Sequence, residues 1–371
     1  MSPVTLPSLP PSPSLFVCDI FSCSCKCCCS QMMVWAAGGV AAGMVLLAAH
    51  SWRRLRGRRE VYGPSKVVVV TGCDSGIGYN VALNTLEWGC SVVATCLDPD
   101  GEAPRRLREA GAVVVKLDLR HLQQDAFKEL LSALNSLKDD DKDLWCLVNN
   151  AGVMTYAHCE WQTKEMVTSQ VEWQTKEMVT SQVEVNLLGL IQVTKVLLPT
   201  LRRNKGRVVM VSSPAGQVAV PNMTVYAATK WGVEGFSHAL RRELTPQGGS
   251  VVLVRPCNLP ANTGILALNA AHLKLMLAAA PPETREDFGV AMMEAEQVFR
   301  EHFQGSDQLP LPLNDRLLAC FRSAIMNQNP CLTYSAAPLP VILSLDLLQL
   351  LPYNWVDFLV AKNLRFHTFF R

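Results

Sequence analysis

Short β-branched runs alternate with segments of helical periodicity from residue 65 to about residue 320. The first run, 66–70, contains four consecutive valines, which is typical of a strand buried on both faces in a parallel sheet. Strands that alternate with helices of about a dozen residues form βαβ units. We therefore predict one α/β domain over 65–320, with a doubly wound parallel sheet of about seven strands. The other strands that the pattern predicts are 91–96, 112–117, 144–148, 207–211 and 251–254.

The N-terminal region departs from this pattern. Residues 32–49 carry no charge and just reach the length that spans a bilayer, and five arginines follow within the basic linker 50–64. Cations after the apolar run favour a transmembrane anchor whose C-terminal side is cytosolic, because cations resist translocation. The other interpretation is an Arg-rich mitochondrial presequence, since Asp19 is the one acidic residue among the first 59.

Composition bounds the class of protein. With 371 residues, 49% of them hydrophobic, the chain can bury one large core, and its net charge of +2 gives no electrostatic basis for nucleic-acid binding. Six of the 14 cysteines lie within residues 1–31 and the other eight are scattered, which predicts reduced core thiols rather than disulfides. Because the cluster lacks separated C-x-x-C pairs, we predict no metal. The segment 1–31 is either acylated or a disordered, mis-assigned extension, and we favour the extension.

One twelve-residue sequence, EWQTKEMVTSQV, occurs twice in tandem, at 160–171 and at 172–183. An identical pair indicates a recent duplication or a gene-model error rather than a solenoid, which needs several diverged units. Twelve residues make 3.3 turns of helix, so a continuous helix would rotate every later residue. We expect either that the first copy loops out or that the product is compromised.

The C-terminal segment 321–371 is predicted to be an apolar helical extension. Its stretch 340–352 is rich in leucine but too short to span a bilayer. We expect it to be buried; packing against a second subunit and lying in a membrane interface are the alternatives.

A glycine-rich loop, TGCDSGIG at 71–78, lies where the first predicted strand ends and a predicted helix begins. Backbone N–H groups there favour a pyrophosphate, as in Rossmann folds. Gly72 permits the tight turn, Gly76 lets the phosphates approach, and Gly78 lets the helix pack on the strand. The candidate cofactor-binding residues of this loop are Gly72, Asp74, Ser75, Gly76, Ile77 and Gly78.

Acidic residues mark the expected ribose end of this site. Asp98 lies 22 residues after Gly76, close to the spacing at which a carboxylate meets the adenosine ribose. Asp74 adds a second negative charge, and no Arg or Lys stands between Asp98 and Gly101, so NAD is favoured over NADP. The alternative is that Asp98 is a turn residue of Asp-Pro-Asp-Gly.

The candidate catalytic pair is Tyr226 and Lys230, which lie one turn apart on a predicted helix. An ammonium there lowers the pKa of a phenol from about 10, so that the phenolate can act as a general base. Ser213 offers a hydroxyl thirteen residues before Tyr226. In Asn149-Asn150-Ala151-Gly152, side-chain amides can satisfy backbone groups of a loop.

The glycine loop, NNAG, the serine and Tyr-x-x-x-Lys, in this order over about residues 65–265, resemble the short-chain dehydrogenase/reductase family. LWCLVNNAGV, EVNLLG and WGVEGFSHALRREL resemble the branch of retinol, hydroxysteroid and D-3-hydroxybutyrate dehydrogenases. Several stretches look most like the animal mitochondrial D-3-hydroxybutyrate dehydrogenases. The resemblance implies an NAD(P)-dependent alcohol dehydrogenase that forms a homodimer or homotetramer.

The resemblance also implies residue roles. Tyr226 would remove the hydroxyl proton as a hydride passes to the nicotinamide, and Lys230 would depress the pKa of that tyrosine and hold the nicotinamide ribose. Ser213 would hydrogen-bond the substrate oxygen, and Asn186 would position a water for the proton relay. In the relatives the spacing from Asn149 to Asn186 looks twelve residues shorter, so 160–171 would be the surplus copy. The further cofactor contacts that it implies are Asp118, Asn149, Ala151, Gly152 and Pro256.

Two positions depart from the family pattern. Cys257 follows Pro256 where the family usually has glycine, so a side chain intrudes where the backbone approaches the nicotinamide. Met223 stands where hydroxybutyrate enzymes place a cation for the substrate carboxylate, and an unpaired carboxylate is costly to bury. The substrate residues we predict are therefore Ser213, Met223 and Tyr226. The neighbours of Met223 are also apolar: Ala215, Val218, Ala219, Val220 and Pro221.

These observations leave three hypotheses. The first is an NAD-dependent dehydrogenase of a lipophilic alcohol of steroid or retinoid type, anchored in the endoplasmic reticulum membrane with a cytosolic catalytic domain. The second is a D-3-hydroxybutyrate dehydrogenase of the mitochondrial inner membrane or matrix. The third, motivated by the repeat and by Cys257, is a catalytically weak NAD-binding protein.

Overall fold

A computed structural model describes most of the chain from residue 63 onward. The cysteine-rich segment 1–31, the predicted anchor 32–49 and most of the linker 50–64 lie outside the described residues. So does most of the first repeat copy. The described residues are Glu60, 63–122, 124–161, 178–257, 265–266, 268–303 and 312–363.

The core of the fold is a seven-stranded sheet in the order β3-β2-β1-β4-β5-β6-β7, with every neighbouring pair parallel. This confirms the doubly wound Rossmann-type sheet. The direction in which successive strands are added to the sheet reverses between β1 and β4. In sheets of this kind, ligands bind in a crevice at that point, beyond the carboxyl ends of the strands. The strands are β1 (Lys66–Thr71), β2 (Ser91–Cys96), β3 (Val113–Lys116), β4 (Asp143–Asn149), β5 (Arg207–Val211), β6 (Ser250–Arg255) and β7 (Thr333–Ser335).

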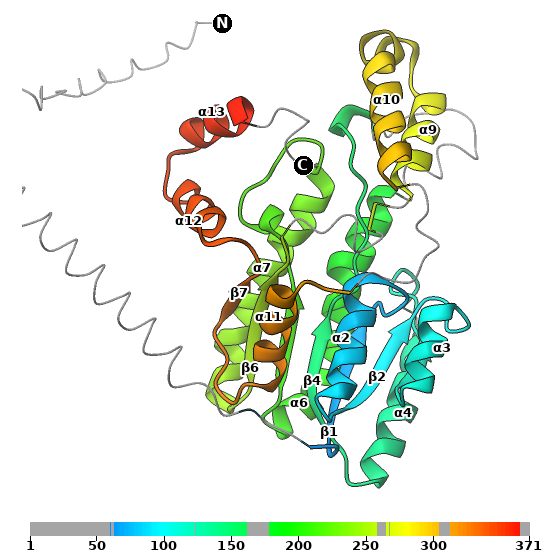
Figure 1. Ribbon diagram of the computed structural model, residues 1–371, viewed down its shortest axis with the longest axis vertical. Helices are drawn as coiled ribbons and strands as arrows, with labels where there is room; N and C mark the ends of the chain where they lie inside the picture. Colours follow the sequence, from blue (N-terminus) through cyan, green and yellow to red (C-terminus); the bar gives the residue numbers. More distant parts are fainter. Residues whose placement is uncertain are drawn as a thin grey trace, which may run out of the picture. The chain divides into compact units, whose positions relative to one another are not determined.

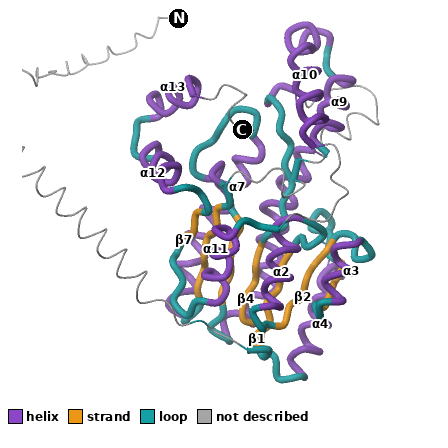
Figure 2. The backbone as a smooth tube through the Cα atoms, in the orientation of Figure 1, coloured by secondary structure: helices purple, strands orange, loops and turns teal. Residues whose placement is uncertain are grey.

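Helices cover both faces of the sheet (Figures 1 and 2). Successive side chains of a strand point to opposite faces, so the valines of β1 divide between two cores. Val68 and Val70 pack in one core with α2, α3 and α11, and Val67 and Val69 in the other with α4, α6 and α7. The helices of the two layers are α2 (Gly76–Glu87), α3 (Glu102–Glu109), α11 (Asp315–Met326), α4 (Lys128–Asp139), α6 (Leu190–Arg203) and α7 (Thr224–Leu244).

The expected domain limit at residue 320 is too early. Strand β7 extends the sheet beyond it, and α11 runs across it with Phe321 and Ile325 in the core. The sequence of β7, Thr-Tyr-Ser, is short and has no apolar run, so periodicity gave no sign of a strand.

The helices that lie beyond the sheet complete the described part. α9 (Asn269–Ala279) and α10 (Pro282–Phe303) pack against one another, and α12 (Leu339–Leu348) and α13 (Tyr353–Asn363) follow β7. The expectation that 340–352 is buried is wrong, because α12 has no buried residue and Leu350 is 82% exposed.

One helix among the described residues, Met178–Arg203, is long and apolar enough to cross a membrane. Its Val193, Leu197 and Leu201 are buried in the core beside the sheet, which accounts for the apolar composition of this helix. The eight cysteines of the described part are all free. Cys73, Cys90, Cys96 and Cys146 are buried, as expected of core thiols, whereas Cys159 is exposed and the other three are half-buried.

Both repeat copies contribute to one cluster of side chains. Trp161, from the first copy, is buried with its ring centroid 6.2 Å from that of Phe288. Met178, from the second copy, is buried in the same cluster and begins the helix that reaches Asn186. The residues between them, 162–177, lie outside the described part.

Candidate active site

A cavity of about 1390 Å³ lies at the carboxyl ends of the strands. Its wall is formed by the glycine loop, the segments that follow β4, β5 and β6, the start of α7, and residues of α9, α12 and α13. Pockets for one small ligand usually have about 300–1,000 Å³, so this cavity has room for a cofactor together with a substrate.

The glycine loop and the segment after β4 are locked together. Asn150 Nδ2 donates hydrogen bonds to the carbonyls of Thr71 (2.8 Å) and Gly72 (3.2 Å). Gly72 has a φ of +70°, and a Cβ on it would come within 2.8 Å of the Ala151 Cα. A Cβ on Gly78 would overlap the Gly72 carbonyl oxygen. Glycine is therefore required at both positions by the close approach of helix, loop and strand.

The loop fits a dinucleotide. Gly72, Asp74, Ser75 and Ile77 line the cavity, and Ser75 is the N-cap of α2 without a capping bond from its side chain. Its hydroxyl and the first N–H groups of α2 are donors of the kind that bind a pyrophosphate. Gly76, with a φ of +55°, begins the helix at this end.

Asp74 and Asp98 occupy the expected ribose end, but in different ways. The Asp74 carboxylate accepts hydrogen bonds from the backbone N–H groups of Leu97 (2.8 Å) and Asp98 (2.9 Å), which joins the loop to the end of β2. Asp98 is exposed, accepts from the Asp100 N–H at 3.2 Å, and is not among the residues that line the cavity. The turn interpretation of Asp98 thus describes its geometry, and its contact with ribose stays a prediction.

Asp118 lines the cavity together with Arg120, a residue for which the sequence analysis had no role. The guanidinium donates two side-chain hydrogen bonds to the Asp118 carboxylate, at 2.8 and 3.0 Å. These bonds hold the pKa of Asp118 well below its usual range. A single arginine after a strand forms no recognisable motif, so nothing in the sequence indicates that Arg120 lines the cavity.

The NNAG segment divides its side chains between core and cavity. Asn149 is buried, and its Nδ2 donates to Thr194 Oγ1 at 2.8 Å, so its side chain does not line the cavity. Asn150, Ala151 and Gly152 do line it. The Asn149 side chain thus lies in the core and not on the cavity wall, and the predicted contact of Asn149 with the cofactor stays a prediction.

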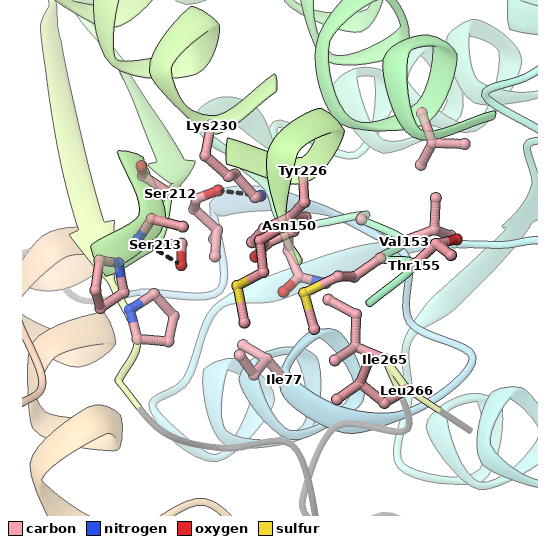
Figure 3. A pocket seen from close by; sticks show the side chains of 18 of the residues that line it. Ile77, Asn150, Val153, Thr155, Ser212, Ser213, Tyr226, Lys230, Ile265 and Leu266 are labelled. Carbon is pink, nitrogen blue, oxygen red and sulfur yellow. Dashed lines mark hydrogen bonds between the residues drawn. The ribbon is translucent and has the colours of Figure 1, made fainter. Parts of the chain in front are cut away.

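Ser213 and Tyr226 both line the cavity (Figure 3). Ser213 follows β5, and its hydroxyl accepts a hydrogen bond from the Ala215 N–H at 3.2 Å. Burial raises the pKa of Tyr226 to about 12, and the Ser213 hydroxyl opposes this rise. The lowered phenol pKa that the Tyr-x-x-x-Lys spacing suggested is therefore not found here, since desolvation is the larger effect.

Lys230 lies deeper, one turn along α7. Its Nζ donates to the Val211 carbonyl at 3.0 Å and is 5.6 Å from the centre of the Tyr226 ring. Burial lowers the pKa of Lys230 to about 8, while the negative charge of Glu234 raises it. The ammonium thus points at the backbone and not at the phenol oxygen, which explains its small influence on Tyr226.

Asn186 belongs to a π-helical turn, η3 (Glu184–Gly189), that precedes α6. Such turns are frequent at functional sites. Asn186 accepts from the Val153 N–H and donates to the Val153 carbonyl, both at 2.8 Å, and it also donates to Thr229 Oγ1 at 3.2 Å. These bonds fix Asn186 between the segment after β4 and α7, beside Lys230.

The part of the cavity wall around Met223 is mostly apolar. Met223, at the start of α7, is buried there with Ala215, Val218 and the half-buried Val220, whereas Ala219 and Pro221 are exposed and turn away. Pro256 and Cys257 line the cavity after β6, and burial raises the pKa of the Cys257 thiol. No group of three or more His, Cys, Asp or Glu in the described ranges is arranged to hold a metal ion.

Comparison with known proteins agrees with this geometry. Residues 66–267 match the profile of a family described as short chain dehydrogenase. The mitochondrial D-beta-hydroxybutyrate dehydrogenase of Rattus norvegicus is 37% identical over 231 residues, which cover 60% of this chain and 64% of that protein. The chain thus spans less than two thirds of that relative.

Other relatives match over a longer stretch. The short-chain dehydrogenase/reductase family 9C member 7 of Bos taurus is 31% identical over 81% of this chain and 90% of its own length. The 17-beta-hydroxysteroid dehydrogenase type 6 of Homo sapiens is 30% identical over 80% of this chain and 88% of its own length. Among solved structures, a short chain dehydrogenase/reductase from Burkholderia phymatum in complex with NAD has a TM-score of 0.55 at 22% identity, covering 76% of this chain and 92% of its own.

Proposed function

Because the chain belongs to the short-chain dehydrogenase/reductase family, whose members are oxidoreductases, we propose that it interconverts a lipophilic alcohol, of steroid or retinoid type, and its ketone or aldehyde. NAD is the proposed cofactor. The observation that carries the substrate class is the apolar wall around Met223, which lines the cavity in the same side-chain cluster as Tyr226.

Ser213 and Tyr226 are the catalytic groups of this proposal. A bound nicotinamide would supply the hydride acceptor for oxidation of the alcohol and the hydride donor for the reverse reaction. Tyr226 takes the hydroxyl proton of the alcohol as general base, and the Ser213 hydroxyl hydrogen-bonds the same substrate oxygen and stabilises its developing charge.

Lys230 and Asn186 support this chemistry. The Lys230 ammonium, which donates to the Val211 carbonyl at 3.0 Å and lies 5.6 Å from the centre of the Tyr226 ring, would hold the nicotinamide ribose. Asn186 holds the proton-relay water beside Lys230, in the geometry that its bonds to Val153 impose.

The charges on the wall favour an uncharged substrate. Lys230 and Arg120 are the Lys and Arg residues that line the cavity within the described part, and Arg120 is already paired with Asp118. A carboxylate held near Met223 would be desolvated without a counter-charge, which is costly. A steroid or retinoid alcohol instead buries apolar surface against the same residues.

The cofactor preference rests on acidic groups. Asp74 and Asp118 both line the cavity at the end that an adenosine would occupy. The negative charge of Asp74 favours ribose hydroxyls and disfavours a 2′-phosphate, which supports NAD over NADP, whereas the charge of Asp118 is offset by its ion pair with Arg120.

Membrane association is supported by the C-terminal helices. Val341, Leu345, Leu347 and Leu348 of α12 line the cavity, while Leu343 of the same helix is 58% exposed and does not line it. Apolar side chains that are exposed beside a substrate cavity suit a helix lying in a membrane interface, from which a lipophilic alcohol would enter. The proposed location is the endoplasmic reticulum membrane with the catalytic domain in the cytosol. Imaging of the tagged full-length chain against reticulum and mitochondrial markers tests it.

D-3-hydroxybutyrate is the second candidate substrate, because the rat hydroxybutyrate enzyme is 37% identical. The test is NAD reduction by the purified full-length chain in detergent, offered a steroid alcohol, retinol and D-3-hydroxybutyrate in parallel. Turnover of a steroid or retinoid supports the proposal. Turnover of hydroxybutyrate alone rejects it, and turnover of none supports a catalytically weak NAD-binding protein.

A further inference from the structure

A polar pair interrupts the apolar wall of the cavity away from the catalytic hydroxyls. Thr155, which follows β4, and His272, on α9, both line the cavity, and Thr155 Oγ1 lies 3.4 Å from His272 Nδ1. Figure 3 shows Thr155 and Ser213 on opposite sides of Tyr226. The roles proposed for Ser213, Tyr226, Lys230 and Asn186 make no use of this pair.

Buried amides hold Thr155 in place. Thr155 is only 2% exposed, and its N–H donates to Gln182 Oε1 at 3.1 Å. Gln182, itself 1% exposed, donates in turn to the Met178 carbonyl at 3.1 Å. The backbone at Thr155 is therefore fixed by buried side-chain amides, and its hydroxyl lies beside the half-buried His272 ring.

His272 is fixed from the other side. Asn269 lies three residues before it on α9, accepts from the Tyr156 N–H at 2.7 Å, and donates to the Tyr156 carbonyl at 3.1 Å. These bonds clamp α9 to the residue next to Thr155. The backbones that carry the two polar side chains are thus held in register, as a preorganised binding site requires.

The chemistry of the pair suits a neutral oxygen. Burial lowers the pKa of His272 below its ordinary value, so the imidazole is uncharged at neutral pH and each of its nitrogens is either a donor or an acceptor. Leu268 and Leu275 of the same helix line the cavity with it. A hydroxyl or ketone oxygen can bond to such a pair in an apolar setting, whereas a carboxylate would lack a counter-charge.

We propose that Thr155 and His272 form a second recognition site, which hydrogen-bonds a neutral oxygen at the end of the substrate remote from the reacting carbinol. The inference rests on the proposed function and narrows it. The substrate is then a rigid lipophile with oxygen at both ends, such as a hydroxy-ketone of steroid type. Retinol, whose ring end carries no oxygen, fits this site less well.

The test compares two saturated steroid alcohols that differ at one place: a ketone on the ring remote from the carbinol, or a methylene there. A site built to bond an oxygen rejects the analogue without it, because its buried polar groups then stay unpaired. For the wild-type chain we expect kcat/KM to favour the ketone-bearing alcohol by roughly 10- to 100-fold, mainly through KM. In His272→Leu this preference falls to near one, and in His272→Gln part of it returns.

The control is Lys274→Leu, an exposed position of the same helix, which keeps the wild-type preference. A wild-type preference near one overturns the inference, as does a His272→Leu variant that slows both alcohols equally. Thermal unfolding of each variant separates misfolding from loss of recognition.

Calorimetric binding of the same two alcohols to the NAD-saturated full-length chain separates this inference from the proposed function. Preferential binding without turnover leaves the recognition site standing and rejects the proposed reaction. Turnover without preferential binding of the ketone-bearing alcohol supports the proposed reaction and rejects the recognition site.

Discussion

The carboxylate of Glu234 accepts two hydrogen bonds of 2.8 Å from the guanidinium of Arg255. Glu234 is one turn beyond Lys230 on α7, and Arg255 ends β6 directly before Pro256 on the cavity wall. This largely buried ion pair joins the helix that carries the catalytic residues to the strand that leads to the cofactor site. Its negative partner also raises the pKa of Lys230 against the effect of burial.

We predict that Glu234→Gln lowers the free energy of unfolding by about 3 kcal/mol, because it leaves the Arg255 charge without its partner. It also lowers the pKa of Lys230 below the present value of about 8. Lys230 acts in its charged form, so activity is lost as pH rises through its pKa. The alkaline limb of the kcat/KM profile therefore moves to lower pH.

Denaturant unfolding and a pH–rate profile measure both effects of Glu234→Gln. Glu243→Gln, at an exposed position of the same helix, is the matched control and changes neither. An unmoved alkaline limb in Glu234→Gln would show that Glu234 does not tune Lys230.

Cys257→Gly is expected to tighten NAD binding several-fold, because it removes a side chain from the wall where the family brings its backbone close to the nicotinamide. Cys257→Ser keeps the Cβ and serves as the comparison. Titration of protein fluorescence with NAD measures both dissociation constants. Equal tightening in the two variants would assign the effect to the sulfur and not to the Cβ.

Asp74→Asn is expected to narrow the preference for NAD over NADP roughly tenfold, since it removes a negative charge near the ribose end while keeping an oxygen that accepts a backbone N–H. The ratio of the two dissociation constants is the measurement. Glu87→Gln, at the opposite end of α2, should leave the ratio unchanged. A preference for NAD that survives intact in Asp74→Asn contradicts the electrostatic account.

Removal of one repeat copy is expected to leave fold and turnover intact. Deleting 160–171 or 172–183 gives the same sequence. The shortened chain keeps one tryptophan and one methionine of the repeat, equivalent to Trp161 and Met178, for the cluster with Phe288. A melting temperature equal to or above that of the full chain is the expected result. A fall of several degrees would mean that both copies are needed.

The strands and helices of the sheet region could largely be predicted from the sequence, because runs of valine are typical of strands that are buried on both faces. The Tyr226 and Lys230 spacing likewise placed both side chains in one cavity. The burial of individual side chains and their hydrogen-bond partners were harder to predict. The Asn149 amide bonds Thr194, 45 residues away, and burial is the largest influence on the pKa of Tyr226. His272 carries no motif, and only the packing of α9 brings it to Thr155.

The central claim is that the Tyr226 hydroxyl moves the substrate proton. Steady-state turnover of the best alcohol by Tyr226→Phe, at an NAD concentration shown by titration to saturate the variant, tests it most directly. The account predicts a loss in kcat of roughly 10²–10⁴-fold with NAD binding retained. A kcat equal to that of the wild-type chain would contradict it.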